Sequence, residues 1–167
     1  VKEHGWEKAT VGVELGHSPR MIAGYLFATE YDFLKENLPE AKLVNALDLM
    51  DEVTYVKEAE EIKLLRQAAA IADAAQARVR ESLCVGLTEQ EIAGIGEMAM
   101  RELGSEFHWP VTGSSEIASG YRTWYAIGGC TPPTDKVLQP SENLLVDMHP
   151  TYRRYYGDLS HNYILGK

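Results

Sequence analysis

Residues 144–166 read LLVDMHPTYRRYYGDLSHNYILG, and this stretch decides the expected fold of the second part of the chain. Two apolar runs, each carrying one aspartate among residues that favour strands, flank a polar segment. If these runs form a hairpin that turns between Tyr152 and Arg153, then Asp147 and Asp158 lie directly opposite each other. Opposed residues project from the same sheet face with Cβ atoms about 4.5–5.5 Å apart. The pattern therefore predicts two carboxylates side by side on one face.

Two ionised carboxylates at that separation repel each other unless a cation lies between them. A metal pair meets this need, because two-metal hydrolytic sites hold their ions about 3.5–4 Å apart. The hypothesis is that Asp147 and Asp158 are metal ligands. The alternative, on spacing alone, is that each aspartate satisfies a turn or caps a local backbone group.

Upstream of this stretch the pattern is helical. We expect one helix over residues 57–83, ended by Gly86, and a second that begins at the capping box of Thr88 and Glu91 and stops at Gly104. The first helix has a face of small residues that lets another element approach closely: Ala68, Ala69, Ala72, Ala75 and Val79. Beyond Gly104, short strands are expected over residues 107–111, 124–127, 144–148 and 152–164.

The first 55 residues predict a β-α-β unit. A strand-like run over residues 9–15 precedes a helix that begins at Ser18 and Pro19, continues to about Glu36 and is stopped by Pro39. A second strand follows over residues 41–44, and such a unit requires a parallel sheet covered by helices. These strands are too few to close a sheet, so we expect the tail of a larger N-terminal domain.

Composition narrows the function classes. The 167-residue chain is 45% apolar, with a net charge of -9 and a pI near 5.0, which argues against a nucleic-acid partner. No stretch is apolar enough to span a bilayer and the opening residues lack a signal-peptide layout, so no membrane partner and a cytoplasmic location are expected. Cys84 and Cys130 are interpreted as two reduced thiols, since their spacing fits neither a disulfide scaffold nor a zinc site.

Three motifs occur together in a familiar order. Residues 145–166 resemble the Asp-x-Gly, Tyr, Gly-Asp-[Ile/Leu]-[Thr/Ser]-Arg pattern of the pita-bread metallohydrolases, which include prolidases, aminopeptidases P and creatinases. Residues 56–69, VKEAEEIKLLRQAA, and residues 86–93, GLTEQEIA, resemble the starts of the two helices that precede it in that family. The resemblance implies an α+β chain: the first half of a pita-bread catalytic domain over residues 56–167, and the C-terminal part of a creatinase-type α/β N-terminal domain over residues 1–55.

The resemblance also implies a chemistry. The family holds two divalent ions, of the Mn, Co or Zn class, through two Asp, one His and two Glu, and cleaves substrates that often carry proline after the scissile bond. Asp147 and Asp158 match the two aspartate positions, whereas the His and both Glu lie downstream in the family. The two ions are thus expected only where those downstream ligands are present. A small peptide or small-molecule substrate and a homodimeric parent protein are also expected.

Some positions of this chain differ from the family pattern, and these differences bear on which substrate is bound. Cys130 stands where peptidases of the family show a substrate-contacting histidine, and residues 120–125, GYRTWY, differ from the usual Gly-x-Asn-x-Ala. His149 replaces the glycine after the first aspartate, and His161 replaces the arginine after the second. Either histidine is an extra ligand or proton carrier, or it simply forms a hydrogen bond, and His149 is also a candidate substrate contact. Cys130 is either a nucleophile or an inert buried thiol.

Three functions remain open on the sequence. The first is a hydrolase resembling Xaa-Pro dipeptidase or aminopeptidase P, in which a metal-activated water cleaves a peptide or related C–N bond. The second is a creatinase-like enzyme that acts on a small molecule, and the third is a non-catalytic pita-bread binding module. The last predicted strand would have an unpaired edge, and such edges pair readily with another chain. We therefore also expect that the chain belongs to a longer, active polypeptide or associates with a copy of itself.

Overall fold

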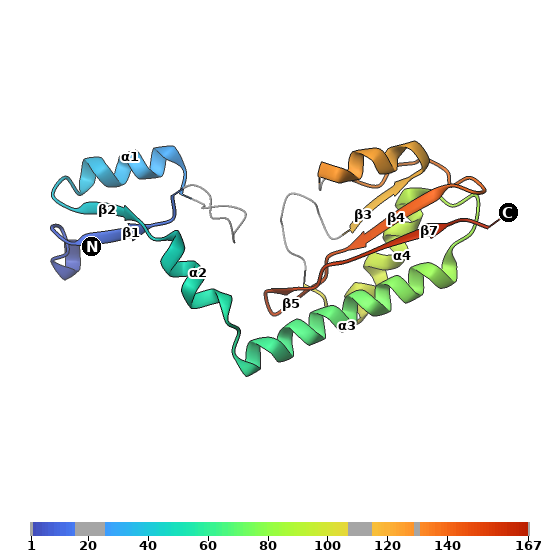
Figure 1. The fold of residues 1–167 in the computed structure, drawn as a ribbon, viewed down its shortest axis with the longest axis horizontal. Coiled ribbons are helices and arrows are strands. Elements are labelled where there is room, and N and C mark those ends of the chain that lie inside the picture. The colour runs from blue at the N-terminus through green and yellow to red at the C-terminus, as the bar shows by residue number, and fades with distance from the viewer. Residues whose placement is uncertain (1, 16–25, 107–114, 129–130, 167) are drawn as a thin grey trace. The chain divides into compact units, whose positions relative to one another are not determined.

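The computed structural model describes residues 2–15, 26–106, 115–128 and 131–166 (Figure 1). The chain divides into two compact units, Val1–Lys57 and Glu58–Lys167. Within the described part of the chain, no helix combines the length and the apolar composition that crossing a bilayer requires.

The first unit contains the predicted β-α-β arrangement. Its two strands pair in parallel, with Thr10 beside Lys42 and Val13 beside Asn45. The predicted helix start at Ser18 and Pro19 lies outside the described residues, and the described helix begins only at Ala28, after an extended Phe27. A helix α2 that had not been predicted follows the second strand. The elements are η1 (Lys2–His4), β1 (Thr10–Val13), α1 (Ala28–Asn37), β2 (Lys42–Asn45) and α2 (Leu47–Tyr55).

The second unit begins with the two predicted helices, α3 (Ala59–Ser82) and α4 (Glu89–Glu102). The capping box is confirmed, because the Thr88 hydroxyl accepts from the Glu91 backbone N–H at 3.1 Å and the Glu91 carboxylate accepts from the Thr88 N–H at 2.7 Å. Gly104 follows α4 with φ of 91°, a left-handed conformation that ends helices and favours glycine.

A three-stranded antiparallel sheet follows, in the order β3-β4-β7. Its strands are β3 (Ser115–Ser119), β4 (Asn143–Met148) and β7 (Leu159–Ile164), with a short hairpin of β5 (Thr151–Tyr152) and β6 (Tyr155–Tyr156) between the last two. The apolar core lies between α3, α4 and one face of this sheet. It contains Ile71, Ala75, Val79, Ile92, Met100, Ile117, Leu144, Val146 and Met148.

The strand predictions are correct in part. Residues 144–148 form β4 as expected, while the expected strand over residues 107–111 lies outside the described residues and β3 was not anticipated. The strand predicted over residues 124–127 is wrong, because these residues belong to the 3-10 helix η2 (Gly120–Gly128). Gly120 has φ of 54° and its carbonyl accepts from the Thr123 hydroxyl at 2.9 Å, which starts a helical turn where aromatic residues alone would favour a strand.

Candidate metal centre

The hairpin that carries both aspartates turns one position later than predicted. Arg153 and Arg154 occupy its two-residue turn with positive φ angles of 49° and 69°, as the tight turn between twisted strands requires. Asp147 therefore pairs with Ser160, so the predicted direct opposition of Asp147 and Asp158 is wrong. Asp158 lies two residues from Ser160 and hence on the same sheet face as Asp147, in the diagonal position.

The register places His149 across from Asp158, and the histidine completes a cluster of three side chains. Its Nε2 lies 3.4 Å from Asp147 Oδ1 and 3.6 Å from Asp158 Oδ1. One potential ligand atom from each residue falls within 4.8 Å of the other two. The side chains of Asp147 and His149 are 21% and 20% exposed, whereas that of Asp158 is 81% exposed, so the cluster opens to solvent on one side.

These spacings suit a shared divalent ion. Metal–nitrogen and metal–oxygen bonds of about 2.1 Å place neighbouring ligand atoms roughly 3.0–3.5 Å apart at one ion. The nitrogen–oxygen distances of 3.4 Å and 3.6 Å lie at or just beyond this range and beyond the usual hydrogen-bond range. A protonated imidazole between two carboxylates is the competing interpretation of the same distances.

Two buried atoms of the cluster have no hydrogen-bond partner among the described residues. They are Asp147 Oδ1 and His149 Nδ1. Buried polar atoms are nearly always satisfied in native proteins, so an orphaned carboxylate oxygen indicates a ligand or solvent molecule beside it. Carboxylate and imidazole together suit Mn, Co or Zn. The residues present therefore fit the divalent ion that the fold implies, with His149 added to the two aspartates.

A buried glutamine fixes the backbone beside both aspartates. Gln76 on α3 is 2% exposed, and its Nε2 donates at 2.9 Å to the carbonyl of Val146 and at 2.9 Å to that of Leu159. Its Oε1 accepts from the Tyr163 hydroxyl at 2.9 Å. Burial raises the pKa of Tyr163, against the opposing charge of Arg80, which keeps this hydroxyl a donor. The glutamine thus connects the strands next to Asp147 and Asp158.

The residue before Asp158 is a glycine for a packing reason. A Cβ at Gly157 would meet the backbone oxygen of Ala68 at 2.6 Å, and the Gly157 N–H donates to the Pro150 carbonyl at 2.8 Å. Ala68 is fully buried, whereas its neighbour Ala69 is exposed, so the predicted small-residue face is confirmed except at Ala69. The small side chain on α3 and the glycine together let the hairpin lie against the helix.

The other residues singled out from the sequence lie elsewhere. His161 on β7 pairs with Val146 on β4, so it lies on the sheet face opposite to that of Asp147. Its Nδ1 lies 3.2 Å from the Tyr163 hydroxyl. Cys130 lies outside the described residues, and Cys84 is a free, exposed thiol. The structure brings His149, but not His161, to the two aspartates.

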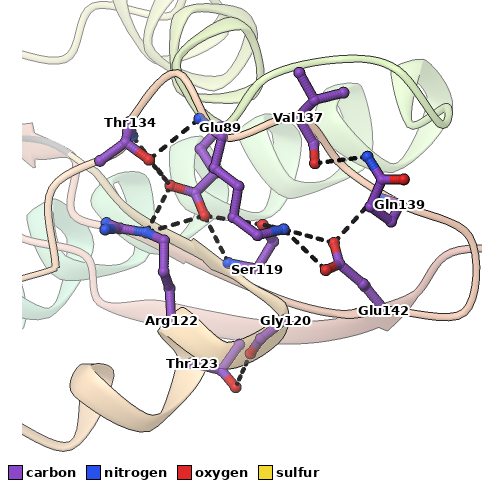
Figure 2. A network of polar contacts seen from close by, with 10 residues as sticks. Glu89, Ser119, Gly120, Arg122, Thr123, Thr134, Val137, Gln139 and Glu142 are labelled. Carbon is purple, nitrogen blue, oxygen red and sulfur yellow. Dashed lines mark hydrogen bonds and ion pairs between the residues drawn. The ribbon is translucent and has the colours of Figure 1, made fainter.

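Arg122, in the segment that departs from the family pattern, is held by a buried carboxylate. Figure 2 shows Glu89 at the start of α4 between Arg122, Ser119 and Thr134. Glu89 is fully buried, and its carboxylate accepts from Arg122 Nε at 3.0 Å and from the hydroxyls of Ser119 and Thr134 at 2.9 Å and 2.7 Å. Arg122 also donates to the carbonyl of Pro132 at 2.8 Å. This network ties η2 and the loop at Thr134 to α4.

The network has a second ion pair beside it. Lys136 Nζ donates to the Ser119 hydroxyl at 2.9 Å and to Glu142 Oε2 at 2.7 Å. Burial alone would raise the pKa of Glu142, but the hydrogen bonds from Lys136 and from the Gln139 N–H lower it overall.

Neither Gln76 nor Glu89 was identified from the sequence. For Gln76 the available signal was a polar residue placed at helical spacing among Ala72, Ala75 and Val79.

Fold and cluster together define an α+β unit of the pita-bread type with a candidate divalent-cation site on the hairpin that follows β4. The sequence profile of the metallopeptidase family M24 matches residues 63–167. The chain belongs to this family.

Named relatives agree with this assignment. The chain is 28% identical over 141 residues to an Xaa-Pro dipeptidase from Pyrococcus horikoshii, covering 81% of this chain and 38% of the relative. It is 32% identical over 126 residues to a probable dipeptidase, PepE, from Mycobacterium tuberculosis, covering 74% of this chain and 32% of the relative. The solved prolidase from Pyrococcus furiosus superposes with a TM-score of 0.78 at 24% identity, covering 99% of this chain and 45% of that chain, and supports the fold. The chain thus spans less than half the length of these relatives.

Proposed function

We propose that the protein containing this chain is a metal-dependent hydrolase of the Xaa-Pro dipeptidase and aminopeptidase P type. The observation that carries the proposal is the convergence of Asp147, His149 and Asp158, with ligand atoms within 4.8 Å of one another, on the hairpin of an M24 chain. The relatives named Xaa-Pro dipeptidase and probable dipeptidase support the substrate class.

In this proposal each residue of the cluster has a role. Asp147 and Asp158 hold divalent ions of the Mn, Co or Zn class, together with His and Glu ligands from the remainder of the protein, and His149 adds an imidazole. Bound ions of this kind activate a water molecule and polarise a scissile carbonyl. Gln76 and Gly157 position the two aspartates through the backbone and by packing. We expect residues 1–167 alone to be inactive, because three ligands do not complete a two-metal site.

The setting of the whole protein is also proposed. Residues 1–55 are the C-terminal part of a creatinase-type N-terminal domain, and residues 56–167 are the first half of the catalytic domain. The exposed thiol of Cys84 suits a reducing, cytoplasmic location. β7 lies at the edge of the described sheet and Ile164 is 78% exposed, which suits a homodimer or a covering segment of the same protein.

A creatinase-like hydrolase of a small non-peptide amide is the second candidate. It is favoured by residues 120–125, which differ from the family's usual sequence and in which Arg122 is engaged by Glu89. A non-catalytic binding module is the third interpretation, and it requires that the cluster holds no metal.

The test is hydrolysis by the full-length protein loaded in turn with Mn²⁺, Co²⁺ and Zn²⁺. We expect release of proline from Ala-Pro, with activity lost in Asp147→Asn and Asp158→Asn and retained in Asp73→Asn, which changes an exposed aspartate on α3. Hydrolysis of creatine without release of proline would favour the second candidate. Tight metal binding without either reaction would contradict both hydrolase proposals.

A further inference from the structure

A second carboxylate lies beside the candidate metal centre. Glu116 on β3 pairs directly with Asp147 on β4 and is 4% exposed. Its neighbour Ile117 is fully buried in the core on the helix side of the sheet, opposite Val146. Because successive residues of a strand point to opposite faces, Glu116 projects from the same face as Asp147. Directly opposed residues have Cβ atoms about 4.5–5.5 Å apart.

Glu116 has almost no compensation for its burial. Its Oε2 accepts one long hydrogen bond, 3.4 Å, from the Thr131 N–H. Among the residues that the structure describes, no Lys, Arg or His forms an ion pair with it. The buried carboxylate of Glu89, by contrast, has partners that offset the cost of burying its charge. Arg122 pairs with it at 3.0 Å, and it accepts hydrogen bonds from Ser119 and Thr134. A buried carboxylate without a cation, opposite a second carboxylate, is unfavourable unless a cation joins it.

A buried hydroxyl beside Glu116 also lacks a partner in the described part of the chain. Thr131 is 3% exposed, and its Oγ1 forms no hydrogen bond with the residues that the structure describes, although its backbone N–H contacts Glu116. Glu116 does not belong to the group of side chains whose ligand atoms converge around His149. The cation that would neutralise Glu116 is therefore expected to belong to a bound molecule and not to be the metal ion of that cluster.

We propose that Glu116, with Thr131 beside it, binds a positively charged group of the substrate next to the metal centre. The group is an ammonium, as in a dipeptide, or a guanidinium, as in creatine, and both offer N–H donors to a carboxylate and a hydroxyl. The inference rests on the proposed function and narrows it: the substrate carries a positive charge near the bond that is cleaved. Glu116 is a specificity-determining residue in this account.

The test uses the metal-loaded full-length protein and two matched ligand pairs. Ala-Pro is compared with N-acetyl-Ala-Pro, and creatine with N-acetylsarcosine, so that each pair differs in its cationic group. Affinity is taken as KM where a ligand is hydrolysed and as a calorimetric Kd where it is not. Wild type is compared with Glu116→Gln and with Glu97→Gln. The latter is a matched control, because the Glu97 carboxylate accepts from the hydroxyl of Ser115, the residue before Glu116, at 2.7 Å.

We expect the wild type to bind the cationic member of one pair about tenfold more tightly or better, because the uncharged member cannot form the charge-assisted hydrogen bond. Glu116→Gln should abolish this preference while its metal content stays near that of the wild type, and Glu97→Gln should keep the preference. The preferred pair identifies the source of the charge. A wild type with no preference in either pair, or a Glu116→Gln variant that keeps it, overturns the inference even where hydrolysis occurs. Loss of bound metal in Glu116→Gln also overturns it, because Glu116 would then be a metal ligand.

Discussion

The side-chain amide of Gln76 on α3 holds the carbonyl oxygen of Val146 on β4 at 2.9 Å, one residue before Asp147. The same nitrogen holds the carbonyl of Leu159, one residue after Asp158, at the same distance. One buried side chain thus fixes the spacing of two strands at the positions where they carry the candidate ligands. The precision of such a site depends on supports of this kind.

Replacing Gln76 by leucine should cost both stability and metal affinity. The change removes three buried hydrogen bonds, to the carbonyls of Val146 and Leu159 and from the Tyr163 hydroxyl, which we expect to lower the free energy of unfolding by about 2–4 kcal/mol. Thermal unfolding of the full-length protein measures the effect, and a Mn²⁺ titration measures the loss of affinity. Gln67→Leu, at an exposed position of the same helix, is the control and should change neither. Equal melting temperatures for the two variants would contradict this role for Gln76.

Gly157 should not tolerate a side chain. A methyl group there would lie 2.6 Å from the backbone oxygen of Ala68, so Gly157→Ala must push the hairpin away from α3, at a cost of about 1–3 kcal/mol. The adjacent Asp158 moves with it, and we expect weaker Mn²⁺ binding. Gly94→Ala is the matched control, since nothing lies within 4 Å of a Cβ at this helical position. That change should stabilise the protein by up to about 1 kcal/mol, and a Gly157→Ala variant as stable as Gly94→Ala would refute the packing argument.

The capping box of α4 should make stability depend on pH. Hydrogen bonds from the Thr88 N–H and hydroxyl lower the pKa of Glu91 below its ordinary value. A lowered folded-state pKa gives stability that is fully present above the unfolded value, about 4.3, and is lost as the pH falls through the folded value. The melting temperature of the wild type should therefore exceed that of Glu91→Gln at pH 6, with the gap closing toward pH 3. The exposed Glu81→Gln serves as control, and a gap that stays constant with pH would contradict this account.

Local signals predicted α3, α4 and the β-α-β unit, but not α2. Thr88, Glu91 and Gly104 act within a few residues of themselves, so the sequence suffices to locate the ends of α4. The strand over residues 144–148 and a hairpin after it were also predicted, because apolar runs around a polar turn have few other solutions. The second predicted strand, over residues 152–164, is divided among β5, β6 and β7.

The site was less predictable because its geometry depends on contacts between distant residues. The register of the hairpin depends on the positive φ angles of Arg153 and Arg154, which arginine rarely adopts. In this register Asp158 lies across from His149 and not, as predicted, across from Asp147. The partners Gln76 and Glu116 are distant in sequence from Asp147 and join it only through folding. The residues of η2 were predicted as a strand from their aromatic side chains, whereas Gly120 and Thr123 start a helical turn there and Arg122 pairs with the distant Glu89.

The most direct test of the central claim is a calorimetric titration of the metal-stripped full-length protein with Mn²⁺. We predict that Asp147→Asn and His149→Ala each weaken binding at least tenfold, because each removes a ligand from a shared ion, while the exposed Asp73→Asn binds like the wild type. If both cluster variants bind Mn²⁺ as tightly as the wild type, then Asp147, His149 and Asp158 form only an ion-paired group, and the hairpin is not a metal centre.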